Sequence, residues 1–509
     1  MDSHQHHHQQ ASVHAHAKCN CCSMSRRCFL ATAGAAAGAA ALAGAAGKAY
    51  SADNPGEYVN LADLRPRPKV KITYVIARQT PPYWLGWPGT SYDVEGWRQR
   101  YGAEFAEMAT RVGVELNAVE TPIESKEAAE AFINKLKTEK PDAVLIMIQH
   151  FAGWEYIQMI ANGAGVPTLV FAPIGMCFTT MIDKFSRQNG VHIVSSLETS
   201  GVEQAMRMVR AKRQFEETRL LVLRQGDRDE NKLPRLGTTL KGIPRDSLPA
   251  LFAKMPENDE AHETAERMMK AAQKVVEPTK QDALNAARSF MAAKRLLVDE
   301  QANAITTDCL GMVTQKDVPT PPCMAAAMFQ DAGVTYGCEA DVDGALSLMF
   351  PSYVFDKPGF MNDPVPETVK NLLIVAHCVS GTKLNGFDQP AEPFVMRSHS
   401  ESALGVSLQV LWKEGQPVTL VKFRGDNELI LDTGTVVSNV QTPPAGGCRT
   451  NFEVLMDRVE DVRDVVGFHQ VVFYGNHRRQ VMDFCQLYGI KVVNSPERTQ
   501  LPQGDAKPA

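Results

Sequence analysis

The sequence lacks several features that would assign it to a common class of protein. Outside the N-terminus no stretch approaches twenty uninterrupted apolar residues, so no membrane-spanning helix is expected there. No GxGxxG motif or P-loop follows any predicted strand, so nucleotide binding has no support. An excess of basic residues is also missing. The net charge is −5, and residues 1–49 carry four basic and one acidic side chain, which leaves about −8 on the rest and argues against nucleic acid as a partner.

Cysteines are present but show no regular spacing. Seven lie beyond residue 49, an odd number without any CxxC pair, at positions 177, 309, 323, 338, 378, 448 and 485. This pattern does not predict a disulfide framework. We expect free thiols, as in a protein that folds in the reducing cytoplasm.

The N-terminal segment 1–50 resembles a twin-arginine export signal with a disordered leader. Ser25–Leu30 reads S-R-R-C-F-L and precedes an uncharged Ala/Gly run that ends at Ala46. Because this route exports folded proteins, we expect a periplasmic or extracytoplasmic protein that meets the membrane only during export. If the signal is not used, the protein is cytoplasmic. The alternative is a chance arginine pair in a disordered tail.

Beyond the leader, the pattern of apolar segments predicts an α/β protein. Apolar strands alternate with helices of ten or more residues, which indicates parallel sheets covered by helices on both faces. We expect two flavodoxin- or Rossmann-like parallel-sheet domains followed by a β-rich C-terminal domain and a disordered tail. Their predicted limits are 68–175, 176–360, 361–496 and 497–509.

Acidic side chains follow two predicted strands of the second domain. Asp308 and Asp317 lie at and beyond the end of a strand at 304–307, and Glu339 and Asp341 lie at a strand-to-helix junction. Ligands of open α/β sheets collect at the carboxyl ends of strands, so these acids are candidate site residues. A helix cap is the alternative role for Asp341.

Histidines stand at strand ends in the C-terminal domain. The candidates are His377 at the end of one predicted strand, His399 and Glu401 in the loop beyond it, and His469 before a late strand. A lone histidine at a strand end is more often structural than a ligand. Two oxygens and one imidazole converging from distant positions would nevertheless suit Mn²⁺ or Mg²⁺ better than a zinc selected by thiolates.

Three segments resemble the L-fucose isomerase family within the fucose/arabinose isomerase superfamily. Cys338–Leu346 reads C-E-A-D-V-D-G-A-L and looks like the E-A-D-x-D-G-A-L segment of that family. His469–Arg479 is similar to its late histidine segment, and Gly311–Asp317 resembles its G-x-K-x-Q-x-E stretch. The chain departs from that stretch at Val313 and at Asp317, where the family has lysine and glutamate. The resemblance covers about residues 300–495.

The resemblance implies a metal-dependent aldose–ketose isomerase that works through a cis-enediol. It implies that Asp341 and His469 hold Mn²⁺ or Mg²⁺, and that Asp317 stands where the family has a glutamate that binds the metal and moves a proton. Our candidate catalytic residues are Asp317, Glu339 and Asp341, with either Asp317 or Glu339 transferring the proton. It also implies a homo-oligomer, a trimer or hexamer, that acts on a small sugar.

Further residues are candidates for sugar contacts through their position: His377, His399, Glu401 and Arg449. Trp84 and Trp87 are others, although packing within their own domain is the more common role. Two other functions remain open. One is an exported sugar-binding protein without catalysis, and the other is a metal-dependent lyase or hydrolase acting on a modified sugar.

Overall fold

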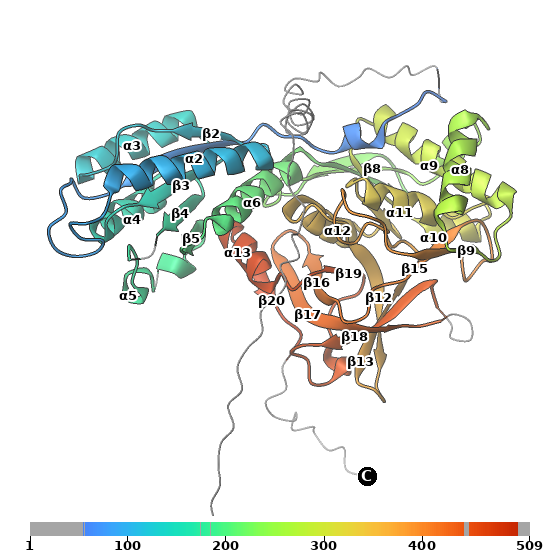
Figure 1. The fold of residues 1–509 in the computed structure, drawn as a ribbon. Coiled ribbons are helices and arrows are strands. Elements are labelled where there is room, and N and C mark those ends of the chain that lie inside the picture. The colour runs from blue at the N-terminus through green and yellow to red at the C-terminus, as the bar shows by residue number, and fades with distance from the viewer. Residues whose placement is uncertain (1–53, 55, 174, 184, 442–446, 497–509) are drawn as a thin grey trace, which may run out of the picture. The chain divides into compact units, whose positions relative to one another are not determined.

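The structure is a computed structural model that describes residues 54, 56–173, 175–183, 185–441 and 447–496 (Figure 1). The expected export signal and the C-terminal tail lie outside the described residues. Two mainly parallel sheets and an antiparallel barrel follow one another along the chain, so the expected order of two α/β units and a β-rich unit is confirmed at that level. No described helix is long and apolar enough to cross a membrane.

The first sheet has five parallel strands in the order β2-β1-β3-β4-β5, a doubly wound order. Every residue of β3 is buried, because helices cover both faces of the sheet. The strands are β1 (Lys71–Ala77), β2 (Glu115–Ala118), β3 (Ala143–Ile148), β4 (Thr168–Ala172) and β5 (Val191–Ser195). The helical segments are η1 (Leu61–Leu64), α2 (Val94–Val112), α3 (Lys126–Glu139), η2 (Phe151–Gly153), α4 (Trp154–Gly163), α5 (Thr179–Ile182), η3 (Phe185–Arg187) and α6 (Ser200–Glu217).

Strand β5 corrects one expectation. It lies within the predicted limits of the second α/β unit, 176–360, yet it pairs in parallel with β4 and completes the first sheet. Apolar periodicity locates a strand but carries no information on which sheet the strand joins.

The second sheet has the order β11-β10-β6-β8-β7, parallel except for the β7–β8 hairpin. Strand β7 reads D-E-N-K and is fully exposed, so its sequence gave no strand signal. The strands are β6 (Arg219–Arg224), β7 (Asp229–Lys232), β8 (Thr239–Pro244), β10 (Ala304–Thr307) and β11 (Tyr336–Cys338). The helices are α7 (Ser247–Phe252), α8 (Asp259–Ala271), α9 (Lys280–Asp299), α10 (Cys309–Thr314), α11 (Cys323–Asp331) and α12 (Val342–Val354).

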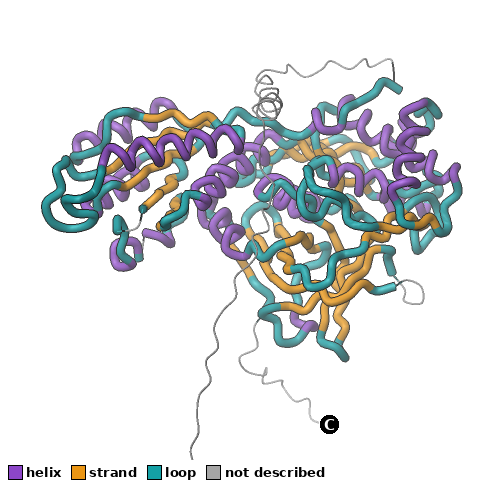
Figure 2. Tube along the Cα trace, viewed as in Figure 1, coloured by secondary structure: helices purple, strands orange, loops and turns teal. Residues whose placement is uncertain are grey.

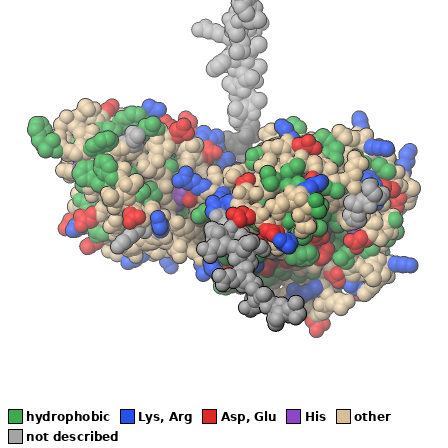
Figure 3. All heavy atoms as spheres, turned by 90° about the horizontal axis from the view of Figure 1, so that it is seen from below, with side chains coloured by type: hydrophobic (Ala, Val, Ile, Leu, Met, Phe, Trp, Pro, Cys, Tyr) green, Lys and Arg blue, Asp and Glu red, His purple; other side chains and the backbone are tan. Residues whose placement is uncertain are grey.

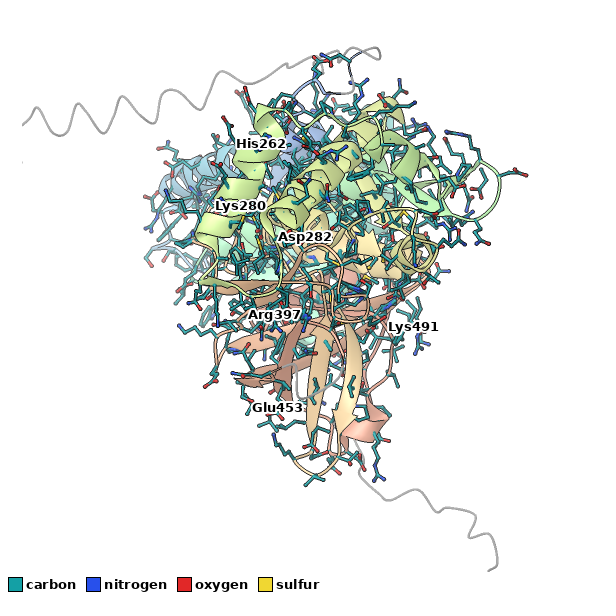
Figure 4. All side chains as sticks on the ribbon, turned by 90° about the vertical axis from the view of Figure 1, so that its right-hand side faces the viewer. His262, Lys280, Asp282, Arg397, Glu453 and Lys491 are labelled. Carbon is teal, nitrogen blue, oxygen red and sulfur yellow. The ribbon has the colours of Figure 1, made fainter. Side chains whose placement is uncertain are left out.

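Helices α8 and α9 lie side by side (Figure 4). Asp282, labelled there in the first turn of α9, accepts hydrogen bonds from the backbone and hydroxyl of Thr279, while the Thr279 hydroxyl accepts from the Asp282 N–H. This reciprocal capping box fixes the start of the helix.

The C-terminal unit is a closed barrel of antiparallel strands in the order β16-β19-β12-β13-β18-β17, with β17 pairing back to β16 (Figure 2). The strands are β12 (Phe360–Glu367), β13 (Leu372–His377), β16 (Pro417–Arg424), β17 (Glu428–Asn439), β18 (Thr450–Met456) and β19 (Gln470–Tyr474). Segments η4 (Val462–Asp464), α13 (Arg478–Tyr488) and β20 (Lys491–Val493) follow β18 and β19, and β20 pairs in parallel with β17.

A small sheet of β15 (Ser407–Val410), β14 (Phe394–Arg397) and β9 (Lys274–Val275) joins the second unit to the C-terminal one. Helix α8 ends at Ala271, and the β9 strand that follows pairs in parallel with β14. An ion pair joins β14 to Glu277, which follows β9. Arg397, labelled in Figure 4, donates to both oxygens of Glu277, at 2.6 Å from Nη2 to Oε1 and 2.8 Å from Nε to Oε2.

Candidate metal centre

The junction between β11 and α12 has an unusual backbone. Glu339 and Ala340 both adopt left-handed conformations, with φ of 56° and 53°. Residues with a Cβ rarely adopt such values, and they gather where a site needs a particular side-chain direction. Asp341 follows as the N-cap of α12, and its Oδ1 accepts the Gly344 N–H at 2.9 Å. Two carboxylates thus leave one junction at the carboxyl end of the second sheet.

His469 reaches this junction from the barrel. It precedes β19, also has a left-handed φ of 55°, and is buried. Its Nδ1 lies 3.0 Å from Oδ2 of Asp341. Its Nε2 lies 3.4 Å from Oε2 of Glu339 and 3.2 Å from Oδ1 of Asp363. The structure therefore brings Glu339, Asp341 and His469 together as the sequence predicted.

Asp363 is a member of the site that the sequence analysis missed. It lies in β12, followed by Pro364 and Pro366, and prolines normally argue against a strand because they cannot donate to its ladder. The strand tolerates them because β19 pairs only with its first part, at Phe360–Asn362. The lone acid beside two prolines was the only sequence signal.

In their neutral forms the two imidazoles differ at Nε2, the nitrogen that faces the carboxylates. Asp341 accepts from Nδ1–H of His469, which leaves the Nε2 lone pair of a neutral ring directed toward Glu339 and Asp363. Nδ1 of His377, at the end of β13, instead accepts the Cys378 N–H at 2.9 Å. The Nε2 of a neutral His377 therefore carries the proton, and it lies 3.8 Å from Oε1 of Glu339. His469 suits a metal, whereas His377 suits a hydrogen-bond donor.

Negative charge dominates this centre. Glu339, Asp341 and Asp363 face one lysine, Lys422, whose Nζ lies 2.5 Å from Oδ2 of Asp341. Burial disfavours the charged ring of His469, but the hydrogen bond to Asp341 and the nearby carboxylates of Asp363 and Glu339 outweigh it and raise its pKa to about 11. Burial likewise opposes ionisation of Asp341, yet His469 and Lys422 hold its pKa well below the usual range. The charged ring thus holds a proton on Nε2, and a cation that binds at Nε2 would replace that proton.

The residues present fit a divalent cation. Nε2 of His469 and Oδ1 of Asp363 are buried and lack a hydrogen-bond partner among the described residues. Ligand atoms of Asp363, His377 and His469 lie within 4.8 Å of one another. Atoms 3.2–3.4 Å apart suit ligands that each lie about 2.1 Å from one ion. Carboxylate oxygens and one imidazole would hold Mn²⁺ or Mg²⁺ rather than a thiolate-selected ion.

Asp341 occupies a different place from the one expected of a direct ligand. Its Oδ1 caps α12, and its Oδ2 accepts from Lys422 and His469. Such a carboxylate orients a ligating imidazole from behind and increases its basicity. Around Nε2 of His469 the candidate ligand atoms are Oε2 of Glu339 at 3.4 Å and Oδ1 of Asp363 at 3.2 Å. Among the described residues, Asp363, His377 and His469 are the group on this ring whose ligand atoms all lie within 4.8 Å of one another.

Asp317 is not brought to this centre. Its carboxylate lies 3.8 Å from Nη2 of Arg245, which also binds Asp308 at 2.9 Å and Gln315 at 2.5 Å. Asp308 is in addition the N-cap of α10. These acids form a separate ion-pair cluster, so the motif resemblance at 311–317 does not carry over to a shared ion.

The residues expected to contact a sugar divide into two groups. His399 and Glu401 line the same cavity as Glu339, Asp363 and His377. Arg449 is instead held by the residue that follows β14, since its Nε donates to the Ser398 carbonyl at 2.8 Å and its Nη2 to the Ser398 hydroxyl at 3.1 Å.

The two tryptophans belong to the first unit and lie near its surface. Trp84 is 80% exposed, so it does not pack within its own domain, whereas Trp87 contacts Phe178 edge-on at 5.7 Å. Figure 3 shows hydrophobic side chains gathered on the part of the surface that the first unit forms.

The cavity beside the carboxylates is small. Its volume is about 30 Å³, enough for one ion or water molecule, so a larger ligand would contact the exposed side of Glu339 and Asp363 rather than enter it. A larger cavity of about 590 Å³ surrounds Asp356 and contains none of the residues of the metal centre. We place the chemistry at the smaller cavity, because the convergent carboxylates and imidazoles are there.

Comparison with known proteins does not assign the chain to a family. No family model and no curated protein matches the chain. Among solved structures, the chain is similar to an ABC transporter solute-binding protein from Burkholderia multivorans. The identity is 10%, the match covers 49% of this chain and 85% of that one, and the TM-score is 0.17. A likeness at that score carries no argument about function.

Proposed function

We propose that this protein is a metal-dependent aldose–ketose isomerase that acts through a cis-enediol and uses Mn²⁺ or Mg²⁺. The observation that carries the proposal is the position of Nε2 of His469, which lies 3.4 Å from Oε2 of Glu339 and 3.2 Å from Oδ1 of Asp363, with Asp341 behind the ring. The resemblance of Cys338–Leu346 to L-fucose isomerases supports the same activity.

The reaction needs help because a proton on the carbon next to a carbonyl is weakly acidic. A bound divalent ion supplies polarisation of the carbonyl and stabilises the negative charge that develops on its oxygen. Glu339, Asp363 and His469 would hold that ion. Lys422 and Asp341 keep the imidazole in the tautomer that leaves Nε2 free.

Proton transfer falls to the carboxylates. The side chains of Glu339 and Asp363 are 28% and 30% exposed, whereas His469 and His377 are almost fully buried behind them. The substrate therefore approaches from the carboxylate side. One carboxylate takes the proton from the carbon next to the carbonyl and returns it to the former carbonyl carbon, while the hydroxyl proton passes from its oxygen to the former carbonyl oxygen.

His377 adds a hydrogen-bond donor beside this carboxylate. Its Nε2–H is aimed toward Oε1 of Glu339 and lacks a partner among the described residues. In that position it would steady the ionised Glu339 or a substrate hydroxyl. Asp317, which the family resemblance placed in the proton-transfer role, is not needed in this arrangement.

The test combines metal analysis with product analysis. The purified protein is incubated with Mn²⁺ and a panel of aldoses, and ketose formation is measured. Wild type should form a ketose and retain about one ion, while Glu339→Gln should keep its fold and lose the activity.

His262→Ala serves as the matched control, since this histidine is exposed on α8 (Figure 4). It should retain both the ion and the activity. Sugar binding that is insensitive to EDTA, together with no ketose from any aldose, would refute the isomerase and favour a binding protein.

A further inference from the structure

The cavity that surrounds Asp356 is large enough for a small molecule. Its volume is about 590 Å³, which lies within the usual range for ligand sites. Segments far apart in the sequence form it, among them the end of α2, helix α6, the residues after α12 and the turn before α13. No residue of the metal centre lines it, so the proposed isomerase reaction does not use it.

This cavity carries an excess of positive charge. Its charged lining residues are four basic and two acidic side chains: Arg65, Arg111, Arg207, Lys357, Asp356 and Asp388. Behind this wall, Arg210 binds Asp356, and Glu203 binds both Arg111 and Arg207, which adds one charge of each sign. The excess therefore stays at two positive charges. That number matches the charge of a phosphate group near neutral pH, about −1.5 to −2.

Lys357 forms no ion pair with an acidic side chain of the described residues. Its Nζ donates to the Tyr474 carbonyl at 3.2 Å and lies 3.5 Å from Nε2 of His477. The side chain is partly buried, and burial lowers the pKa of its amine. A partly buried ammonium without a counter-charge is unfavourable, because no ion pair offsets its desolvation. An anion bound in the cavity would supply that counter-charge.

Other donors on the lining residues are also unused. A guanidinium has five N–H donors in a planar fork. Among the described contacts, Arg65 bonds through Nη2 alone, to Asp356 at 2.8 Å and to the Ser352 carbonyl at 2.9 Å, and its Nε has no partner. Nε2 of Gln204 likewise has no hydrogen-bond partner among the described residues. The ion pairs of Asp356 explain why arginines converge here, but they do not use all the donors.

We propose that this cavity binds a phosphate dianion, either inorganic phosphate or the phosphate group of a small molecule. Lys357 would bind it as a point charge, and the arginine forks match the geometry of its oxygens. Phe387, whose ring centroid lies 4.7 Å from the guanidinium carbon of Arg65, adds an apolar wall for the rest of a small molecule. Phosphate binding here needs neither the metal ion nor isomerase activity, so either property can be absent without the other.

The experiment is isothermal titration of the full, metal-free protein with inorganic phosphate and, separately, with glucose 6-phosphate. We expect one equivalent of inorganic phosphate to bind in a chloride buffer. Tighter binding of glucose 6-phosphate would assign the site to an organic phosphate, and equal or weaker binding would assign it to inorganic phosphate. Lys357→Met keeps the aliphatic chain but removes the charge. It should weaken phosphate binding about 10- to 100-fold, as loss of a hydrogen bond to a charged group does.

Lys280→Met is the matched control, because Lys280 is exposed at the start of α9 and does not line the cavity (Figure 4). It should bind phosphate as wild type does. Asp388→Asn removes an exposed acid from the wall and should tighten binding by up to about 5-fold, a gain that a damaged fold would not give. Circular dichroism checks the fold, and Arg111→Gln replaces Lys357→Met if that variant does not fold. No phosphate binding by wild type, an unchanged affinity in Lys357→Met, or weaker binding by Asp388→Asn would overturn the proposal.

Discussion

Oδ2 of Asp341 accepts a hydrogen bond from Nδ1–H of His469 across 3.0 Å, between residues that are 128 positions apart. The bond connects the first turn of α12 with the residue that precedes β19 in the barrel. It fixes which nitrogen of His469 is free. The same carboxylate also caps a helix and binds Lys422, so its position is determined from three sides.

Asp341→Asn tests this orienting role. An amide can accept from only one of its two terminal atoms, so the cap at Gly344, the Lys422 ion pair and the His469 bond cannot all persist. We expect Mn²⁺ to bind about 10- to 100-fold more weakly, as for other orienting partners of metal ligands, with binding retained at high Mn²⁺. Isothermal titration of metal-free protein measures this.

His469→Ala is the comparison for that variant, since it removes the ligand itself and should abolish Mn²⁺ binding. Equal, complete loss of the ion in both variants would mean that Asp341 ligates the metal directly. An unchanged affinity in Asp341→Asn would mean that His469 needs no orienting carboxylate.

Asp363→Asn and Asp317→Asn separate the geometric ligand set from the one that the sequence resemblance implies. Asp363 faces His469 at 3.2 Å, whereas Asp317 pairs with Arg245. We expect Asp363→Asn to lose the bound ion and the ketose product, and Asp317→Asn to retain the ion. Metal content by mass spectrometry decides between them. Retention in Asp363→Asn with loss in Asp317→Asn would reverse the assignment.

Much of the fold could be predicted because local patterns determine it. The buried strand Ala143–Ile148 is an uninterrupted apolar run, and Ala304–Thr307 was located with the bounds that the structure gives. Glu339, Asp341 and His469 were found because they stand at strand ends, where side chains of a sheet converge. Closure of the barrel was not predictable, since the pairing of β16 with β17 and of β12 with β19 is set by tertiary packing.

The missed site residues share a physical reason. Asp363 was hidden by the prolines that follow it, and Lys422 by its place in an apolar strand that reads as core. The five cysteines that line the small cavity beside Glu339 could not be grouped from the sequence, because they are separated by up to 139 positions. Asp317 shows the opposite error, since a short sequence likeness suggested a role that its ion pair with Arg245 does not favour.

Asp356 is expected to stabilise the fold through its ion pairs with three arginines. Its carboxylate binds Arg65 and Arg210, each at 2.8 Å, and also Arg207. Asp356→Asn removes the charge but retains a residue type that tolerates its left-handed φ of 52°. Three guanidinium groups would then lack their shared partner, and we expect a loss of about 3 kcal/mol in the free energy of unfolding.

Urea unfolding measures this change. The control is Asp388→Asn, an exposed acid on the same cavity, for which we expect a change within about 0.5 kcal/mol. Similar small effects in both variants would show that solvent already screens the arginine cluster.

His477 is expected to make the stability of the protein depend on pH. Its ring is stacked on Phe355 with centroids 4.3 Å apart, and its Nε2 lies 3.5 Å from Nζ of Lys357. Burial, reinforced by the charge of Lys357, lowers its pKa to about 4. The folded protein therefore keeps this ring neutral at pH values where the unfolded chain, with a histidine pKa of about 6.5, already binds the proton.

The direction in which the free energy of unfolding changes with pH depends on which state binds more protons. Between about pH 6.5 and pH 4 the unfolded state holds more protons at this position, so the free energy of unfolding decreases as pH falls. Over that interval the contribution of His477 amounts to about 3 kcal/mol at most, at about 1.4 kcal/mol for each pH unit. His477→Gln should be less stable at neutral pH because the stacking is lost, but its stability should decline less steeply on acidification.

Urea unfolding of wild type and His477→Gln at several pH values in this interval checks the slope. Other groups that titrate there are common to both chains, so their contributions cancel in the difference between the two slopes. His262→Gln changes an exposed histidine of α8 and should follow the wild-type slope. Parallel slopes for wild type and His477→Gln would show that the ring is protonated in the folded protein as readily as in the unfolded chain.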